Sequence, residues 1–151
     1  MKDVVDMIAL ACDHGGFELM GSVKNHLDSK GLEYKDFGTD SAESCDYPEF
    51  AVPAARSVAS GECDRGILIC GTGIGMSIAA NKNPGIRAAL CADLFSAEMS
   101  RRHNDANVLT LGARVTGASL ALDIVEKFLN TGFDSGGRHS RRVDMLNALD
   151  G

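Results

Sequence analysis

The stretch Gly66-Ile67-Leu68-Ile69-Cys70 runs directly into Gly71-Thr72-Gly73-Ile74-Gly75, and this junction decides the fold. The first five residues carry no charge, which is typical of a strand buried on both faces of a parallel sheet. The glycine-rich turn and the apolar residues after it predict that a helix begins near residue 74. A buried strand that feeds a helix through a glycine turn is a building unit of α/β proteins.

The same alternation of strand and helix continues outward from this junction. Residues 7–12 predict a strand that ends at Asp13-His14-Gly15-Gly16, and residues 17–30 carry apolar side chains at helical spacing. Repeated strand and helix units predict an α/β fold with a parallel sheet, as one domain over residues 1–151. The other expected strands are 32–37, 86–91 and 108–112, and the other expected helices are 47–59, 74–81, 94–103, 118–129 and 140–149.

Composition narrows the class of partner. With 151 residues and 44% hydrophobic content, the chain can bury one substantial core. Its 15 Lys and Arg against 21 Asp and Glu give a net charge of -6, which argues against nucleic acid or an anionic membrane as a partner. The five cysteines form no CxxC pair and no signal peptide is recognisable, so we expect a cytoplasmic protein without disulfides.

Three segments contain side chains or backbone groups that could take part in chemistry. Two of them lie at strand-to-helix turns, where open α/β sheets bind ligands. At the first, Asp13 and His14 precede two glycines, and the same residues also fit an N-cap beside an exposed histidine. At the second, Gly71 to Gly75 open a helix and so form a candidate anion hole with Thr72 in it. It is not a Walker loop, and Met76 replaces the third glycine of a dinucleotide fingerprint.

Cys70 stands at the entrance of this turn. A cysteine that ends an apolar strand is most often a small buried hydrophobic residue, but the adjacent helix N-terminus favours a thiolate here. The third segment is His103-Asn104, near the end of a predicted helix. Arg114 follows the end of the strand expected at 108–112. Further basic residues cluster in the tail of this acidic chain, where a solvated face is the ordinary interpretation; they are Arg138, His139, Arg141 and Arg142.

These segments together resemble the ribose-5-phosphate isomerase B family nearly end to end. The matching motifs are Asp13-His14-Gly15-Gly16, Asp46-Tyr47-Pro48, Cys70 to Gly75, His103 to Val108 and Gly137-Arg138-His139. The resemblance implies a Rossmann-like three-layer α/β/α sandwich with a five-stranded parallel sheet in the order 21354. It also implies a homodimer with sites at the subunit interface, no cofactor and no metal, and a dimer of two such dimers stays open. Independently of the resemblance, the expected helix at 140–149 is the segment most detached from the alternating pattern, so we expect it to contact the partner subunit.

The resemblance also implies roles for individual residues. Cys70 matches the base that moves a proton between C2 and C1 of ribose 5-phosphate, which becomes ribulose 5-phosphate, and His103 matches the group that opens the sugar ring. The anion hole for the enediolate matches Gly71, Thr72, Gly73, Ile74 and Gly75. The substrate contacts match Asp13, His14, Tyr47, Asn104, Arg114, Arg138 and Arg142.

Some alternatives stay open at this stage. Cys70 and Met76 indicate the branch that uses a cysteine base, and Met20 is expected to face outward. A hexose 6-phosphate, of allose or galactose, fits the same reaction class. A nucleotide-binding regulatory module is the rival in another class, with Asp93 as its acidic residue. No set of His, Asp and Glu has metal-ligand spacing.

Overall fold

The computed structural model describes residues 3–151, and the first two residues of the expected domain lie outside this range. Five parallel strands form one sheet in the order β2-β1-β3-β5-β4, so the predicted α/β fold and strand order are confirmed. In chain order the elements are β1 (Met7–Cys12), α1 (Phe17–Ser29), β2 (Glu33–Asp36), α2 (Pro48–Ala59), β3 (Arg65–Cys70), α3 (Ile74–Asn81), β4 (Ala88–Leu90), α4 (Leu94–Arg102), β5 (Val108–Gly112), α5 (Ala118–Asn130) and α6 (Gly137–Ala148).

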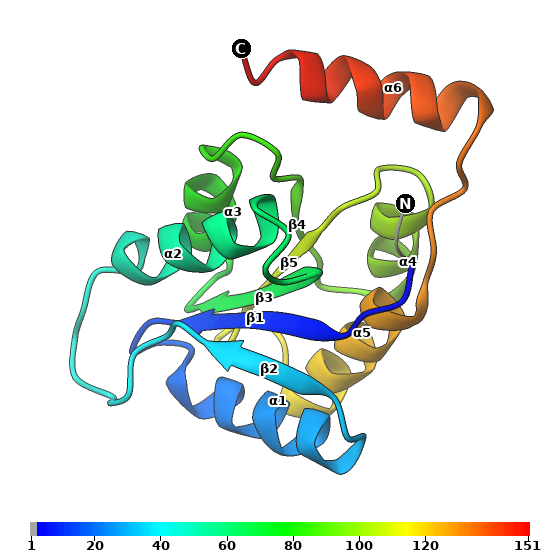
Figure 1. Cartoon of the computed structure of the whole chain (residues 1–151). Coiled ribbons are helices and arrows are strands. Elements are labelled where there is room, and N and C mark those ends of the chain that lie inside the picture. The colour runs from blue at the N-terminus through cyan, green and yellow to red at the C-terminus, as the bar shows by residue number, and fades with distance from the viewer. Residues whose placement is uncertain (1–2) are drawn as a thin grey trace.

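Helices cover both faces of the sheet (Figure 1), and a hydrophobic core lies on each face. Along β3, Ile67 and Ile69 enter the core beneath α1 and α5, whereas Leu68 and Cys70 enter the core beneath α2 and α3. Every residue of β3 is buried, as the uncharged run at its end predicts. The side chain of Cys70 therefore points toward the layer that contains α3.

Glycines allow the turn after β3 to lie against the end of β5. A Cβ atom on Gly112 would stand 2.5 Å from the backbone carbonyl of Thr72, which is too close for any side chain. Gly73 has φ +80°, a left-handed backbone, and a Cβ there would meet Leu90 at 2.5 Å. The loop that carries Cys70 is thus packed directly on the neighbouring strand.

The expectation that Met20 faces outward is wrong. Its side chain is fully buried, because it belongs to the apolar stripe of α1 together with Leu19, Val23 and Leu27. The strand expected at 86–91 is shorter at both ends, since a turn ends at Ile86, whose N–H donates to the carbonyl oxygen of Asn83. These differences leave the topology unchanged.

Helix α6 lies apart from the layers, across the side of the molecule that carries α3 (Figure 1). It begins at Gly137, three residues before the expected start at 140, and Val143 is its one buried residue. Gly136 and Gly137, at φ +86° and +68°, turn the chain into this helix. No helix within residues 3–151 is long and apolar enough to cross a membrane.

We expect Gly112→Ala to destabilise the fold, because the new methyl group must displace the backbone at Thr72. The free energy of unfolding, measured by urea denaturation, should fall by about 1–3 kcal/mol. Gly21→Ala is the matched control, since a Cβ on this residue of α1 meets nothing within 4 Å. That variant should gain about 0.5–1 kcal/mol. Equal stability of the two variants would contradict the close packing.

Candidate active site

The turn after β3 holds the Cys70 thiol in a defined setting. The side chain is 5% exposed, and its Sγ accepts the N–H of Gly73 at 3.2 Å. The carbonyl oxygen of Gly73 in turn accepts the hydroxyl of Thr110 at 3.0 Å, and Thr72 Oγ1 accepts the N–H of Ile74 at 3.3 Å. The thiol therefore lies against backbone donors of a turn that β5 holds in place.

The turn that follows Cys70 contains unpaired backbone donors. Among residues 3–151, nothing accepts the N–H groups of Gly71, Thr72 and Gly75. These groups lie at the N-terminus of α3, where the helix dipole adds a partial positive charge. The turn can therefore stabilise an anion next to the sulfur of Cys70.

The first turn touches the second. A Cβ on Gly15 would lie 3.1 Å from the backbone nitrogen of Gly71, so the two turns are in contact. Asp13 is 6% exposed, and its Oδ1 accepts the N–H of Gly16 at 3.1 Å. The N-cap of α1 is Gly16 itself, with no side chain bonded as a cap, so Asp13 is not the N-cap that the sequence left open. Its bond closes the turn before the helix and fixes the carboxylate beside the Cys70 turn.

His14 is oriented by a contact that the sequence did not suggest. Its Nδ1 accepts the backbone N–H of Cys45 at 3.2 Å, and the thiol of Cys45 lies 3.9 Å from the same atom. Because Nδ1 is an acceptor, a neutral His14 carries its proton on Nε2. The ring can then donate from Nε2 to a ligand at the edge of the sheet.

Tyr47 and Arg114 complete this group. The Tyr47 ring packs on Gly75, where a Cβ would meet it at 2.5 Å, and the Arg114 side chain lies 3.6 Å from the position of a Cβ on Gly71. We call this set the carboxyl-edge cluster, because its members surround the carboxyl end of β3; they are Asp13, His14, Tyr47, Cys70 to Gly75 and Arg114.

His103 lies elsewhere, at the C-terminal end of α4. Its ring stacks on that of His139 in α6, with centroids 4.2 Å apart and planes 8° from parallel. Desolvation lowers the pKa of His139, and the nearby His103, Arg138 and Arg142 lower it further, against a smaller opposing effect of Asp134. We use the name amino-edge cluster for the predicted site residues in this part of the molecule; they are His103, Asn104, Arg138 and Arg142.

A buried ion-pair network shapes the turn after His103. Asp105 has φ +46°, and its carboxylate bridges two guanidinium groups, at 2.9 Å from Arg101 Nη1 and 3.3 Å from Arg87 Nη2. Arg101 is fully buried and also donates to the carbonyl oxygens of Ala106 and Thr131. The left-handed residue is thus held by charge and hydrogen bonds.

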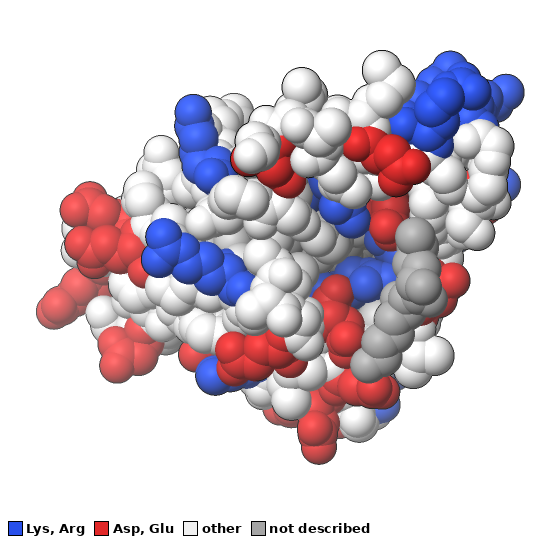
Figure 2. Space-filling view, turned by 45° about the horizontal axis from the view of Figure 1, so that its top comes forward, with Lys and Arg blue, Asp and Glu red and all other residues white. Residues whose placement is uncertain are grey.

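The two clusters lie at opposite edges of the sheet. Cys70 pairs in register with Gly112, the last residue of β5, whereas His103 precedes the first residue of that strand. Five strand residues separate those ends by about 13 Å. Within one chain, then, the structure brings together the carboxyl-edge residues and, separately, His103 with α6. Figure 2 shows basic side chains gathered at the corner where α6 begins.

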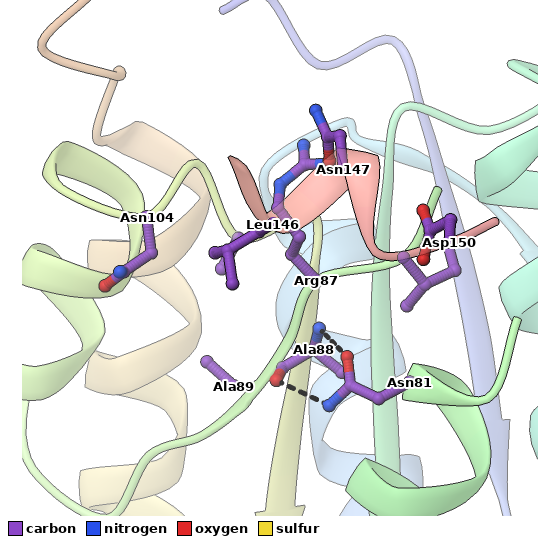
Figure 3. Close-up of a pocket in the computed structure, with 10 residues that line it drawn as sticks. Asn81, Arg87, Ala88, Ala89, Asn104, Leu146, Asn147 and Asp150 are labelled. Carbon is purple, nitrogen blue, oxygen red and sulfur yellow. Dashed lines mark hydrogen bonds between the residues drawn. The ribbon is translucent and has the colours of Figure 1, made fainter. Parts of the chain in front are cut away.

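A cavity of about 310 Å³ lies under α6, at the amino edge (Figure 3). Arg87 Nη1 donates to Asn147 Oδ1 at 3.0 Å across it, and the Asn81 amide pairs with the backbone of Ala88. Among the predicted site residues, only Asn104 lines this cavity. This cavity therefore lies between α6 and the sheet and is not lined by Cys70.

The structure bears on the nucleotide-binding alternative and on the question of a metal site. Asp93, the acidic residue of the nucleotide-binding alternative, caps α4: its carboxylate accepts the N–H of Ser96 at 2.7 Å and the hydroxyl at 2.8 Å. These bonds lower the pKa of Asp93 and occupy the group that would bind a ribose. Among residues 3–151, no three His, Cys, Asp or Glu side chains are grouped as metal ligands.

The contacts of three residues that shape the site were not predicted from the sequence. Thr110 interrupts the apolar run of β5, and a polar residue in a buried strand is the signal that could have pointed to its bond with Gly73. Cys45 and His139 gave no such signal, because their partners His14 and His103 are 31 and 36 positions away in the chain. Only the folded chain brings these groups together.

Comparison with known proteins gives a consistent result. Residues 8–146 match the model of a family described as Ribose/Galactose Isomerase. The chain is 51% identical to ribose-5-phosphate isomerase B of Escherichia coli over 143 residues, which cover 95% of each chain. It is also 51% identical to a putative sugar phosphate isomerase, YwlF, of Bacillus subtilis over 140 residues, or 92% of this chain and 93% of the relative.

Solved structures are similar over the same length. Ribose-5-phosphate isomerase B from Clostridium thermocellum superimposes with a TM-score of 0.93 at 53% identity, covering 95% of this chain and 97% of that one. At this identity the similarity extends to the sequence as well as to the fold.

Alkylation with iodoacetamide at pH 8 should separate the five thiols. Burial raises the pKa of Cys12 to about 12, and burial likewise raises the pKa of Cys63 and Cys91, so these three should stay unmodified in the folded protein. Cys45, which is partly exposed, and Cys70 should be labelled, as peptide mass spectrometry would reveal. Labelling in urea, where all five react, is the control. A Cys70 as inert as Cys12 would argue against an activated thiol.

Proposed function

The chain belongs to the Ribose/Galactose Isomerase family, and from this we propose that it interconverts ribose 5-phosphate and ribulose 5-phosphate. The observation that carries the proposal is the turn from Cys70 to Gly75, which joins a thiol to unpaired N–H donors at a helix N-terminus. Those are the two groups that moving a proton next to a carbonyl requires.

The thiolate of Cys70 takes the proton from C2 of the open-chain aldose. The electrons of the broken C–H bond form the C1–C2 double bond, and negative charge develops on the former carbonyl oxygen. The N–H groups of Gly71, Thr72 and Gly75 stabilise that charge, an effect worth about 3 kcal/mol for one well-placed donor. A proton then returns to C1 and the hydroxyl proton of O2 moves to O1, which leaves the ketose.

Ring opening precedes this step, because ribose 5-phosphate closes its ring through O4. The ring oxygen gains a proton as the C1–O4 bond breaks, and the C1 hydroxyl loses one as the carbonyl forms. We assign this exchange to His103, since imidazole changes protonation near neutral pH. Asp13, Tyr47 and Asn104 would contact the sugar hydroxyls, whereas His14, Arg114, Arg138 and Arg142 would bind the phosphate.

The opposite positions of the two clusters support a shared site. His103 and Cys70 lie at different ends of β5, so His103 of the partner subunit has to reach Cys70 in an assembled dimer. Exposed apolar side chains support such a pairing: Ile74 and Ile78 on α3 are 52% and 56% exposed. Leu90 on the edge strand β4 lies over Gly73, so this apolar surface borders the Cys70 turn.

Helix α6 supplies a matching surface. Met145, Leu146 and Leu149 are exposed by 64%, 45% and 80%, in a helix that buries little against its own chain. An exposed apolar patch of this kind is typical of a subunit contact. We therefore propose a homodimer, or a dimer of two such dimers, of single-domain chains, in which α6 contacts the partner. A reducing cytoplasm suits five unpaired thiols.

The test of the reaction is kcat/KM for ribose 5-phosphate, allose 6-phosphate and galactose 6-phosphate, with Cys70→Ala as the control. We expect a preference for the pentose and a loss of at least about a thousandfold in the variant, because no other group replaces the base. Activity on a hexose phosphate alone would keep the chemistry and change the substrate. No activity on any of the three would refute the isomerase.

A mixing experiment tests the shared site. Cys70→Ala and His103→Asn should each be inactive as pure dimers, yet a hybrid dimer contains one site with both residues intact. After the two are unfolded and refolded together, half of the dimers are hybrids, so we expect about a quarter of wild-type activity. Each variant refolded alone is the control. A mixture as inactive as its parents would mean that Cys70 and His103 act within one chain.

A further inference from the structure

The stack between His103 and His139 has no part in the function proposed above. The two rings come from the end of α4 and the first turn of α6, and they lie face to face at 4.2 Å. Within residues 3–151, no hydrogen bond fixes the His103 imidazole, and its backbone N–H is bonded to Met99. The contact with His139 is therefore what sets the plane of the His103 ring.

Polar contacts hold α6 in the position that this stack requires. Before the helix, Asp134 pairs with Arg102 at 3.0 Å, and the backbone N–H of Asp134 donates to the carbonyl oxygen of Arg102. At the far end, Arg87 Nη1 donates to Asn147 Oδ1 at 3.0 Å, and the N–H of Gly85 donates to Asp150 at 2.7 Å. Figure 3 shows the side chains of Arg87 and Asn147 side by side. The helix is thus tied at both ends to the segments that flank His103 and Asp105.

Burial in the hydrophobic cores does not explain the position of α6. Among the residues of α6, Val143 alone is buried, so the helix adds little apolar area to either core. Its first turn, however, carries Arg138 and His139, and the ring of His139 stacks on His103. Arg142 follows in the second turn, and both arginines are near enough to lower the pKa of His139. Holding the start of α6 against His103 therefore fixes the imidazole relative to the two arginines.

Charge favours a neutral His139 in the stack. Desolvation, His103 and the two arginines lower the pKa of His139, and only Asp134 opposes them. A neutral ring can face His103 in either protonation state, whereas two imidazolium rings would repel each other. A neutral His139 ring is therefore suited to stack on a histidine that gains and loses a proton during turnover.

We propose that His139 is a positioning residue for His103, and that it holds the imidazole plane so that a ring nitrogen reaches the ring oxygen of the bound sugar. This inference rests on the proposed isomerase and deepens it. It ties the ring-opening group to the proposed phosphate-binding arginines through the first two turns of α6. Catalytic groups displaced by about 1 Å can lose up to a hundredfold in rate, so such a support has a measurable effect.

The stack is tested first without any activity. His139→Phe keeps a flat ring over His103, whereas His139→Leu keeps bulk without a ring. The ring current of the neighbour displaces the NMR resonances of the carbon-bound protons of His103, which are easily assigned among four histidines. We expect the displacement to persist in the Phe variant and to vanish in the Leu variant. Unchanged His103 resonances in His139→Leu would overturn the inference.

The kinetic test separates ring opening from proton transfer. Ribulose 5-phosphate is open-chain, because its phosphate occupies the hydroxyl that could close a five-membered ring, so exchange of its C1 hydrogen with deuterated solvent needs Cys70 but no ring opening. His139→Leu should lower turnover of ribose 5-phosphate roughly ten- to a hundredfold and leave the exchange rate within about twofold. His139→Phe should behave as wild type.

His26→Leu and His26→Phe are the matched controls, because His26 pairs with Glu126 on the opposite layer of the molecule. Both should retain the wild-type ratio of turnover to exchange. Equal losses of turnover and exchange in His139→Leu would indicate a merely structural role and overturn the inference. A wild-type protein that neither turns over nor exchanges sugar phosphates would refute the proposed function, while the NMR result still decides the stack.

Discussion

The close approach of the Cys70 turn to the end of β5 is the constraint on which the rest of the site depends. Gly112 admits the Thr72 backbone where any Cβ would collide with it, and Thr110 holds the carbonyl of Gly73 from the same strand. With the turn held in this way, the N–H of Gly73 meets the sulfur of Cys70, and α3 begins with its free donors beside it. A backbone contact between neighbouring strands thus creates the chemical setting of one thiol.

Parallel topology then imposes a second constraint. Each strand in this sheet ends at the edge where Cys70 lies, and each helix returns to the other edge, so His103 at the end of α4 cannot stand beside Cys70 in the same chain. The proposed dimer, with one edge placed against the other, would bring the two residues together without any long loop. The exposed apolar side chains on α3 and α6 lie along the surface that such a dimer would cover.

Sequence reasoning recovered the elements that local pattern determines. The uncharged run that ends in β3 and the glycine turn after it predicted the strand, the start of α3 and the place of Cys70. Met20 was wrongly expected to face outward, although its helical spacing with Leu19, Val23 and Leu27 places it in the core. Asp93 looked like a ligand group and is a helix cap. The contacts of Cys45 with His14 and of His139 with His103 were not predicted, since they depend on how distant segments meet.

The contrast between the two clusters has a physical basis. The carboxyl-edge cluster is built on buried strands and glycine contacts, so its geometry is fixed by the same packing that stabilises the fold. The amino-edge cluster rests on ion pairs, a left-handed Asp105 and a stacked ring, around a helix with a single buried side chain. Because Arg101 is fully buried, its pair with Asp105 has to stay satisfied, and removal of either partner would leave an uncompensated buried charge. The ring-opening role proposed for His103 would therefore depend on polar contacts between distant segments rather than on the packing of an apolar core.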